Sequence, residues 1–183
     1  MRLSESRKKC SCMDFKELAQ ARYSLRKFSD RPVEQEKLDL ILEAARCAPT
    51  AHNLQPQRVL VLRSPEAREK AHRATPFHFG EPVLLVVACD EAASWHRECD
   101  NKAHGQIDAA IAVTQMMLQA ADLGLGTTYV GVFDPEVLHS EFPEELKDLT
   151  PIALLPLGYP AEGAHPSRLH ADRKPLEELV KYL

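Results

Sequence analysis

The chain has 183 residues, of which 44% are hydrophobic and 27% charged, as expected for one globular domain. The formal net charge is −4 and the two signs are interspersed, so no surface for nucleic acid is indicated. No apolar run approaches the roughly 20 residues of a membrane helix, and the N-terminus lacks the apolar stretch of a secretory signal, so we expect a cytoplasmic protein that binds no membrane.

The N-terminal residues and the cysteines bear on the extent of the domain. Residues 1–12 are polar and precede a second methionine, Met13, so we expect a disordered tail or an over-extended start, followed by a single domain over 13–183. Cys10 and Cys12 on that tail are an incomplete ligand set for a metal. The five cysteines are odd in number and lack the spacing of a disulfide framework, so we expect free thiols.

Periodicity and capping residues predict the elements. In chain order we expect helix 14–22, an extended segment 24–33, helix 34–47, loop 49–57, strand 58–62, helix 65–74, strand 82–90, helix 106–123, strand 127–133, helix 134–142, strand 151–159 and helix 175–183. Asp14 can cap the first helix, Pro32 favours an extended chain before it, and Gly124 ends the long helix. Residues 91–104 are polar and fit no element. The pattern indicates an α+β domain.

Two basic clusters lie far apart in the sequence. The first combines basic side chains with a hydroxyl: Arg22, Ser24, Arg26 and Lys27. The second lies within 167–179 and holds three cations: Arg168, Arg173 and Lys174. Arginine binds phosphate through two parallel hydrogen bonds. The clusters would therefore form a phosphate pocket if they met in space, and a solvated basic surface is the alternative for the first cluster.

Two loops have the small and polar residues that contact a ligand. Residues 48–57 combine small side chains with the amides Asn53, Gln55 and Gln57, although an ordinary helix-to-strand loop fits equally well. In 124–133 (GLGTTYVGVF) the first two glycines follow a predicted helix and precede a predicted strand. A dinucleotide-binding loop has the opposite order, with its glycines after a strand and before a helix. Gly131, within the strand pattern, indicates that a ligand approaches the backbone.

Taken together, these motifs resemble those of the nitroreductase family of flavoproteins. The shared order is R-x-S-x-R-x-F, A-P-T-A-x-N-x-Q-P, a long helix into G-L-G-T-T-x-x-G-x-F, then L-P-L-G-Y-P-A-E and R-K-P-L-E-E, and it covers 13–183. The resemblance implies an intertwined homodimer with a central, mostly antiparallel sheet flanked by helices. It also implies two FMN sites, each formed at the subunit interface.

The resemblance also implies a role for individual residues. Near the FMN phosphate and ribityl chain it places Arg22, Tyr23 and Ser24, with Arg173 holding the phosphate and Arg26 beside the N1–C2 carbonyl edge of the ring. From the other subunit it brings Pro49, Thr50, Ala51 and Asn53. Along the dimethylbenzene-to-N5 side it places Tyr129, Val130 and Gly131, whose backbone amides would hydrogen-bond the ring.

The implied activity is hydride transfer from NADH or NADPH, through flavin N5, to a nitroaromatic, quinone or similar small oxidant in a ping-pong cycle. Because the flavin carries this chemistry, no catalytic side chain is expected. Two alternatives stay open: a non-catalytic flavin-binding or interaction protein on the same fold, and a specialised flavin enzyme that dehalogenates its substrate or fragments flavin.

Some positions depart from the family pattern or carry no assignment. Tyr23 and Tyr129 stand where many relatives have other residues, and residues 78–82 do not align clearly. The segment 91–104 is a candidate wall or lid over the site, or else a surface crossover with Trp95 in the core. Its donor side chains do not have a usual zinc spacing, so no metal is expected: His96, Cys99, Asp100 and His104.

Overall fold

A buried antiparallel sheet is the centre of the computed structural model, which describes residues 14–183. Its strands are β1 (Gln57–Leu62), β2 (Val83–Cys89), β5 (Gly126–Thr127) and β6 (Thr150–Gly158), in the order β1-β2-β6-β5. The expected tail 1–12, with Cys10 and Cys12, lies outside the described residues. The α+β class and the antiparallel sheet are as predicted.

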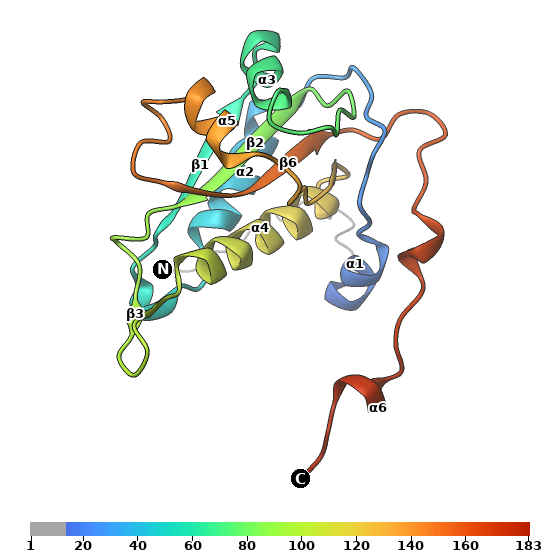
Figure 1. The fold of residues 1–183 in the computed structure, drawn as a ribbon. Coiled ribbons are helices and arrows are strands. Elements are labelled where there is room, and N and C mark those ends of the chain that lie inside the picture. Colours follow the sequence, from blue (N-terminus) through green and yellow to red (C-terminus); the bar gives the residue numbers. More distant parts are fainter. Residues whose placement is uncertain (1–13) are drawn as a thin grey trace, which may run out of the picture.

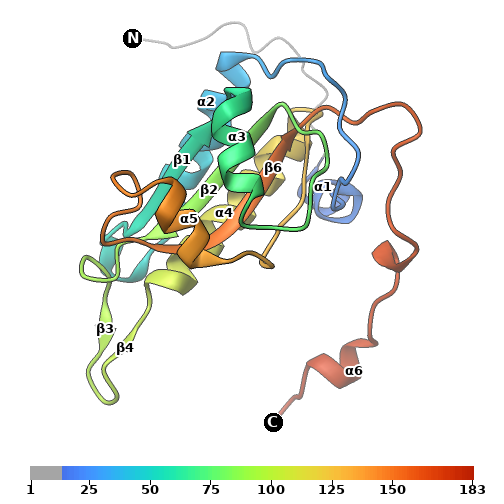
Figure 2. The same ribbon diagram turned by 45° about the horizontal axis from the view of Figure 1, so that its top comes forward.

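Helices cover both faces of this sheet (Figures 1 and 2). The helices of the described chain are α1 (Phe15–Ala21), α2 (Gln35–Arg46), α3 (Pro65–His72), α4 (Gly105–Asp122), α5 (Pro135–Glu141) and α6 (Leu176–Leu179), of which α6 lies away from the sheet. On one face, α2 and α4 pack against Val83, Leu85 and Val87 of β2. On the other face, α3 and α5 pack against Leu84 and Val86. All seven residues of β2 are therefore buried, which explains its nearly continuous apolar sequence.

The predicted helix ends are confirmed where a capping residue marks them. The Asp14 carboxylate accepts a hydrogen bond from Glu17 N at 2.9 Å and begins α1. Gly124 has φ +73° just beyond α4, the left-handed conformation with which helices commonly end. Two short 3-10 turns, η1 (Ala51–Asn53) and η2 (Arg168–His170), add to the predicted elements.

Two predicted elements were wrong in extent. The strand expected over 127–133 pairs only at Gly126–Thr127 and through an isolated bridge at Val130, because the chain then leaves the sheet edge and the carbonyl of Val132 accepts a hydrogen bond from the Thr75 hydroxyl. The helix expected over 175–183 shrinks to Leu176–Leu179. Its apolar side chains are exposed, and without a packing surface such a short helix is not extended.

Residues 91–104, which matched no predicted element, contain a hairpin of β3 (His96–Arg97) and β4 (Lys102–Ala103). This hairpin projects from the body beside the N-terminal end of α4, and the chain after β6 extends away from the body at the other side (Figures 1 and 2). Both projections are therefore available for contact with another molecule.

Gly126 is expected to be intolerant of any side chain. A Cβ at this position would lie 2.8 Å from Leu25 Cβ and closer still to Leu25 Cδ2, and Leu25 is fully buried. Replacing Gly126 by Ala should lower the free energy of unfolding by about 1–3 kcal/mol, because overpacking strains a close-packed core. Urea denaturation measures this.

Gly131→Ala is the matched control, since its Cβ would meet only Tyr129 Cε1 at 3.6 Å. Its effect should stay within about 0.5 kcal/mol. Equal stability of the two variants would contradict the packing described for β5.

Candidate functional site

The extended segment that follows α1 is fastened to the edge of the sheet. Leu25 N donates to Thr127 O at 2.9 Å, and Ser24 and Thr127 form a parallel bridge. Farther along, Phe28 bridges Pro160, and both Leu25 and Phe28 are buried. These anchors hold the first basic cluster in a fixed place beside the end of β6.

The two basic clusters meet in a pocket of about 230 Å³. The first cluster contributes Arg22, Tyr23, Ser24 and Arg26, and the second contributes Ser167, Leu169, His170 and Arg173. Among residues 14–183, no Asp or Glu lines this pocket and none of its three arginines is in a salt bridge. The arrangement can therefore bind an anion through several charge-assisted hydrogen bonds.

Within the described part of the chain, the guanidinium groups of Arg26 and Arg173 hydrogen-bond only to nearby backbone carbonyls. Arg173 Nη1 donates to Asp172 O at 2.7 Å and to Leu169 O at 3.4 Å. Arg26 Nη1 lies 3.5 Å from Ser24 O. Each arginine has five N–H donors, so most of the donor capacity is left for a ligand.

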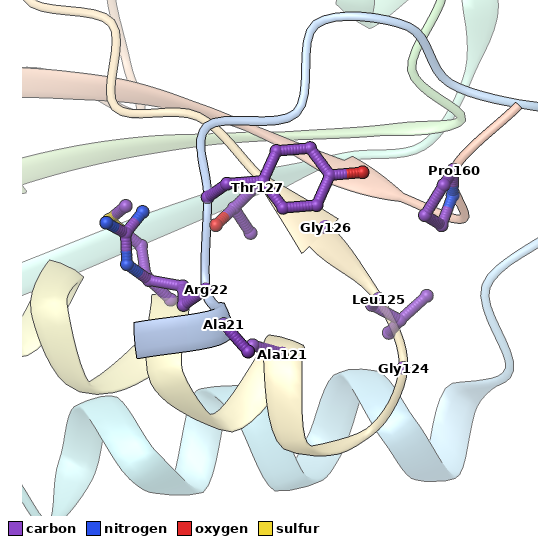
Figure 3. Close-up of a pocket in the computed structure, with 10 residues that line it drawn as sticks. Ala21, Arg22, Ala121, Gly124, Leu125, Gly126, Thr127 and Pro160 are labelled. Carbon is purple, nitrogen blue, oxygen red and sulfur yellow. The ribbon is translucent and has the colours of Figure 1, made fainter. Parts of the chain in front are cut away.

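An apolar groove of about 190 Å³ adjoins the basic pocket and shares Arg22 and Tyr23 with it. Figure 3 shows Arg22 at the end of α1, Ala121 on the last part of α4, and Pro160 after β6 around this groove. The Thr127 hydroxyl is buried there without a hydrogen-bond partner among the described residues. A basic pocket joined to an apolar groove suits a ligand with an anionic end and a flat apolar end.

The predicted triplet 129–131 lies a few residues beyond β5, near this groove. Tyr129 is 43% exposed, whereas Val130 is buried. Val130 N donates to Leu154 O at 2.9 Å and its carbonyl accepts from Leu154 N at 3.0 Å. The amide of Val130 is therefore occupied, and backbone donors toward a ligand can come only from its neighbours.

The other predicted contact loop lies at the far end of α4. Ala51 N donates to Asp108 Oδ1 at 3.1 Å, and Asp108 is in the first turn of α4. The groove that adjoins the arginine pocket is instead lined by Ala121 and Gly124, at the C-terminal end of α4. With 18 residues at 1.5 Å each, α4 spans about 27 Å. One chain therefore does not bring Pro49, Thr50, Ala51 and Asn53 to the arginine pocket.

Several lining residues were missed by the sequence analysis. Ser167 and His170 stand in the same run as Arg173, so the basic cluster could have indicated them. Asp108 gave no signal, because a single carboxylate at the start of an apolar helix is usually a solvated end-turn residue.

The described chain offers neither a further cluster of metal ligands nor a membrane-spanning helix. Over 14–183, no three His, Cys, Asp or Glu side chains come together as metal ligands. In the same range, no helix combines the length and apolar character needed to cross a bilayer.

Comparison with known proteins gives consistent matches. A family model described as the nitroreductase family matches residues 19–75 and 70–159. A protein named NADH dehydrogenase from Thermus thermophilus is 34% identical over 201 residues, covering 92% of this chain and 95% of its own.

Solved structures agree with these sequence matches. A nitroreductase family protein from Clostridium difficile has a TM-score of 0.86 and 40% identity, over 93% of this chain and 98% of that one. A protein described as a nitroreductase in complex with FMN, from Desulfovibrio desulfuricans, has a TM-score of 0.77 and 29% identity, over 91% and 95% of the two chains.

A hydrogen-bonded cluster around Tyr159, the residue before Pro160 of the groove, can be tested by titration. The Tyr159 hydroxyl donates to Glu34 Oε2 at 2.7 Å, and Arg31 donates to Glu34 Oε1 at 2.7 Å while stacking on the Tyr159 ring. The Tyr159 hydrogen bond, backbone hydrogen bonding and Arg31 together lower the pKa of Glu34 from 4.5 to about 2.

Tyr159→Phe should raise the pKa of Glu34 toward 4.5, because the largest cause of its depression is removed. Since the folded pKa is depressed, the cluster stabilises the fold above about pH 4.5 and loses this effect as pH falls to about 2. The stability difference between wild type and variant should shrink over that range. NMR titration of the Glu34 carboxyl measures the pKa directly, and a wild-type value near 4.5 would refute the cluster.

Proposed function

Because the chain belongs to the nitroreductase family, we propose that it is an FMN-dependent oxidoreductase that passes a hydride from NADH or NADPH to a small organic oxidant. The observation that carries this proposal is the convergence of Arg22, Arg26 and Arg173 in one pocket free of carboxylates. Nitroaromatics and quinones are the proposed classes of oxidant.

The residues of the pocket fit FMN. Arg22 and Arg173 supply guanidinium donors for the phosphate, with Tyr23 and Ser24 beside them for the ribityl chain. The adjoining apolar groove, with its unpartnered Thr127 hydroxyl, has the character required for the start of a flat ring system. The chemistry that FMN supplies when bound is hydride transfer at N5, so no side chain has to act as nucleophile, acid or base.

The side chains around the ring would set its electrostatics and orientation. Arg26 is exposed at the rim of the pocket and is the cation available for the N1–C2 carbonyl edge. A cation there stabilises negative charge on the ring by about 1–3 kcal/mol through a charge-assisted hydrogen bond. With the Val130 amide already bonded to Leu154, the backbone donors toward N5 would be those of Tyr129 and Gly131.

A second copy of the chain would complete the site. In a dimer, the loop with Thr50, Ala51 and Asn53 from one subunit would reach the flavin held by the other, because within one chain α4 keeps them apart. The outer side of α4 supports this arrangement: Ile107 is 44% exposed, and Leu118, three turns on, is only partly buried.

The C-terminal segment supports an intertwined dimer. It extends from the body after β6 (Figure 1), and its large apolar side chains are exposed: Leu169, Leu176, Leu179, Val180 and Tyr182. Exposed apolar residues in this number indicate a surface that becomes buried on association. Because Arg173 lies on the same segment, wrapping it around a partner would also fix one wall of the phosphate pocket.

Spectroscopy tests the activity directly. The purified protein should be yellow, should bleach anaerobically with NADH or NADPH, and should recover its colour with a nitroaromatic or a quinone. Retained colour without bleaching by either nucleotide would favour the non-catalytic alternative. Failure of the protein to bind FMN at all would refute the proposal.

Arg173→Ala should raise the dissociation constant of FMN by about 10- to 100-fold, because it removes charge-assisted hydrogen bonds to the phosphate. Titration of apoprotein with FMN, followed by quenching of flavin fluorescence, measures the constant. Lys174→Ala is the matched control, since Lys174 is the neighbouring cation, pairs with Glu178 and does not line the pocket. Equal retention of FMN by the two variants would remove Arg173 from the phosphate site.

Ile107→Asp should weaken both dimer formation and FMN binding, because a buried unpaired carboxylate opposes association. Analytical ultracentrifugation and flavin content measure the two effects, and Ile107→Val is the control that keeps the apolar side chain. A dimer of Ile107→Asp with full flavin content would place the interface elsewhere on the chain.

A further inference from the structure

The loop over 49–55 adopts a backbone conformation that needs support. His52, Asn53 and Gln55 have φ values of 52°, 56° and 52°, in the left-handed region that non-glycine residues rarely adopt. The loop closes on itself through Asn53 N to Thr50 O at 3.0 Å and Gln55 N to the Thr50 hydroxyl at 3.1 Å. Such conformations persist only where the surrounding structure stabilises them, and they are frequent at active sites and ligand-binding sites.

Asp108 supplies the first external support. Asp108 is 3% exposed, and its Oδ1 accepts the hydrogen bond from Ala51 N at 3.1 Å. Its Oδ2 is buried and has no hydrogen-bond partner among residues 14–183. The N-terminal turn of α4 favours a negative charge, but a buried carboxylate with one bond to the chain is a poor choice for stability alone.

Trp95 supplies the second support from the base of the hairpin. Its ring stacks on His52, with centroids 5.4 Å apart and an interplanar angle of 17°. The His104 ring also contacts Trp95 in a T-shaped arrangement with centroids 4.8 Å apart, and His104 N donates to Trp95 O at 3.0 Å. The indole is therefore fixed before it contacts the loop, and it can restrict the position of His52.

We propose that Asp108 and Trp95 are positioning residues that hold loop 49–55 ready to contact the cofactor bound by the partner subunit. The proposal rests on the proposed function, because only there does this loop become part of a flavin site. A loop held before binding does not have to be ordered when the ligand arrives, so its support increases affinity without new contacts. The hairpin thereby takes part in cofactor binding through its base.

Matched substitutions separate this role from a general structural one. Asp108→Ala should weaken FMN binding about tenfold, the effect of losing one charge-assisted hydrogen bond. Asp108→Asn keeps an oxygen that can accept from Ala51 N and should stay within about threefold of wild type. Trp95→Leu should weaken binding, whereas Trp95→Phe keeps an aromatic ring against His52 and should largely restore it.

Two readouts show whether the loop itself has changed. The apoprotein of Asp108→Ala should still unfold in one cooperative thermal transition well above the assay temperature, so that weaker FMN binding cannot result from global unfolding. Trp95 is the only tryptophan of the chain, so its emission reports on the loop without labelling. In the apoprotein, Asp108→Ala should change this emission and Asp108→Asn should not.

The possible results discriminate between the two proposals. Wild-type affinity for FMN in Asp108→Ala would overturn the positioning role while leaving the proposed function intact. Loss of affinity in Asp108→Asn as large as that in Asp108→Ala would overturn it as well, because the bond to Ala51 would not be the cause. A wild-type protein that binds no FMN would instead refute the proposed function.

Discussion

The rigid separation imposed by α4 is the constraint on which the rest of the site depends. Its inner side is fully buried against the sheet at Ala109, Val113 and Met116, so the helix cannot shorten, bend away or slide without opening the core.

The two ends of α4 hold different parts of the proposed site. The N-terminal end holds the loop 49–55 through Asp108. At the other end the chain turns at Gly124 into β5, which holds the segment with Arg22 and Arg26. The same helix therefore holds both parts of the proposed site and keeps them apart. A dimer in which two such helices face each other resolves this, because each end of one helix can then lie near the opposite end of the other.

The distribution of charge is the second feature that determines which ligand the pocket can bind. The chain carries a net charge of −4, yet three arginines line a pocket without any carboxylate. Like charges held this close repel each other unless an anion lies between them. A phosphate group would remove that repulsion and use guanidinium donors that have no acidic partner among the described residues. The adjoining groove, lined mostly by apolar side chains, gives the remainder of the ligand an apolar surface. The pocket therefore selects for a molecule with one anionic end.

Much of the fold could be predicted from the sequence because its elements bury regular apolar faces within one chain. Strand β2, helices α2 and α4, the Asp14 cap and the Gly124 stop all depend on local patterns, and the structure confirms them. The predictions failed at 127–133 and 175–183, where the chain leaves the sheet or the body and meets no further packing surface in its own subunit. The sequence could not show whether the two basic clusters meet in space, because a local pattern carries no information on the distance between residues far apart in the chain. Asp108 was missed altogether, because its partner Ala51 is 57 residues away and contributes only a backbone amide.

Subunit complementation tests most directly whether the two parts of a site come from different chains. Arg173→Ala damages the pocket part and Asn53→Ala the loop part, so each homodimer should bind FMN weakly. If each site combines the pocket of one subunit with the loop of the other, a mixed dimer of the two variants contains one intact site and one with both defects, and we expect it to bind one FMN with wild-type affinity. If both parts belonged to the same subunit, every site of the mixed dimer would carry one defect. Titration of purified mixed dimers that shows no tight site would then contradict the account.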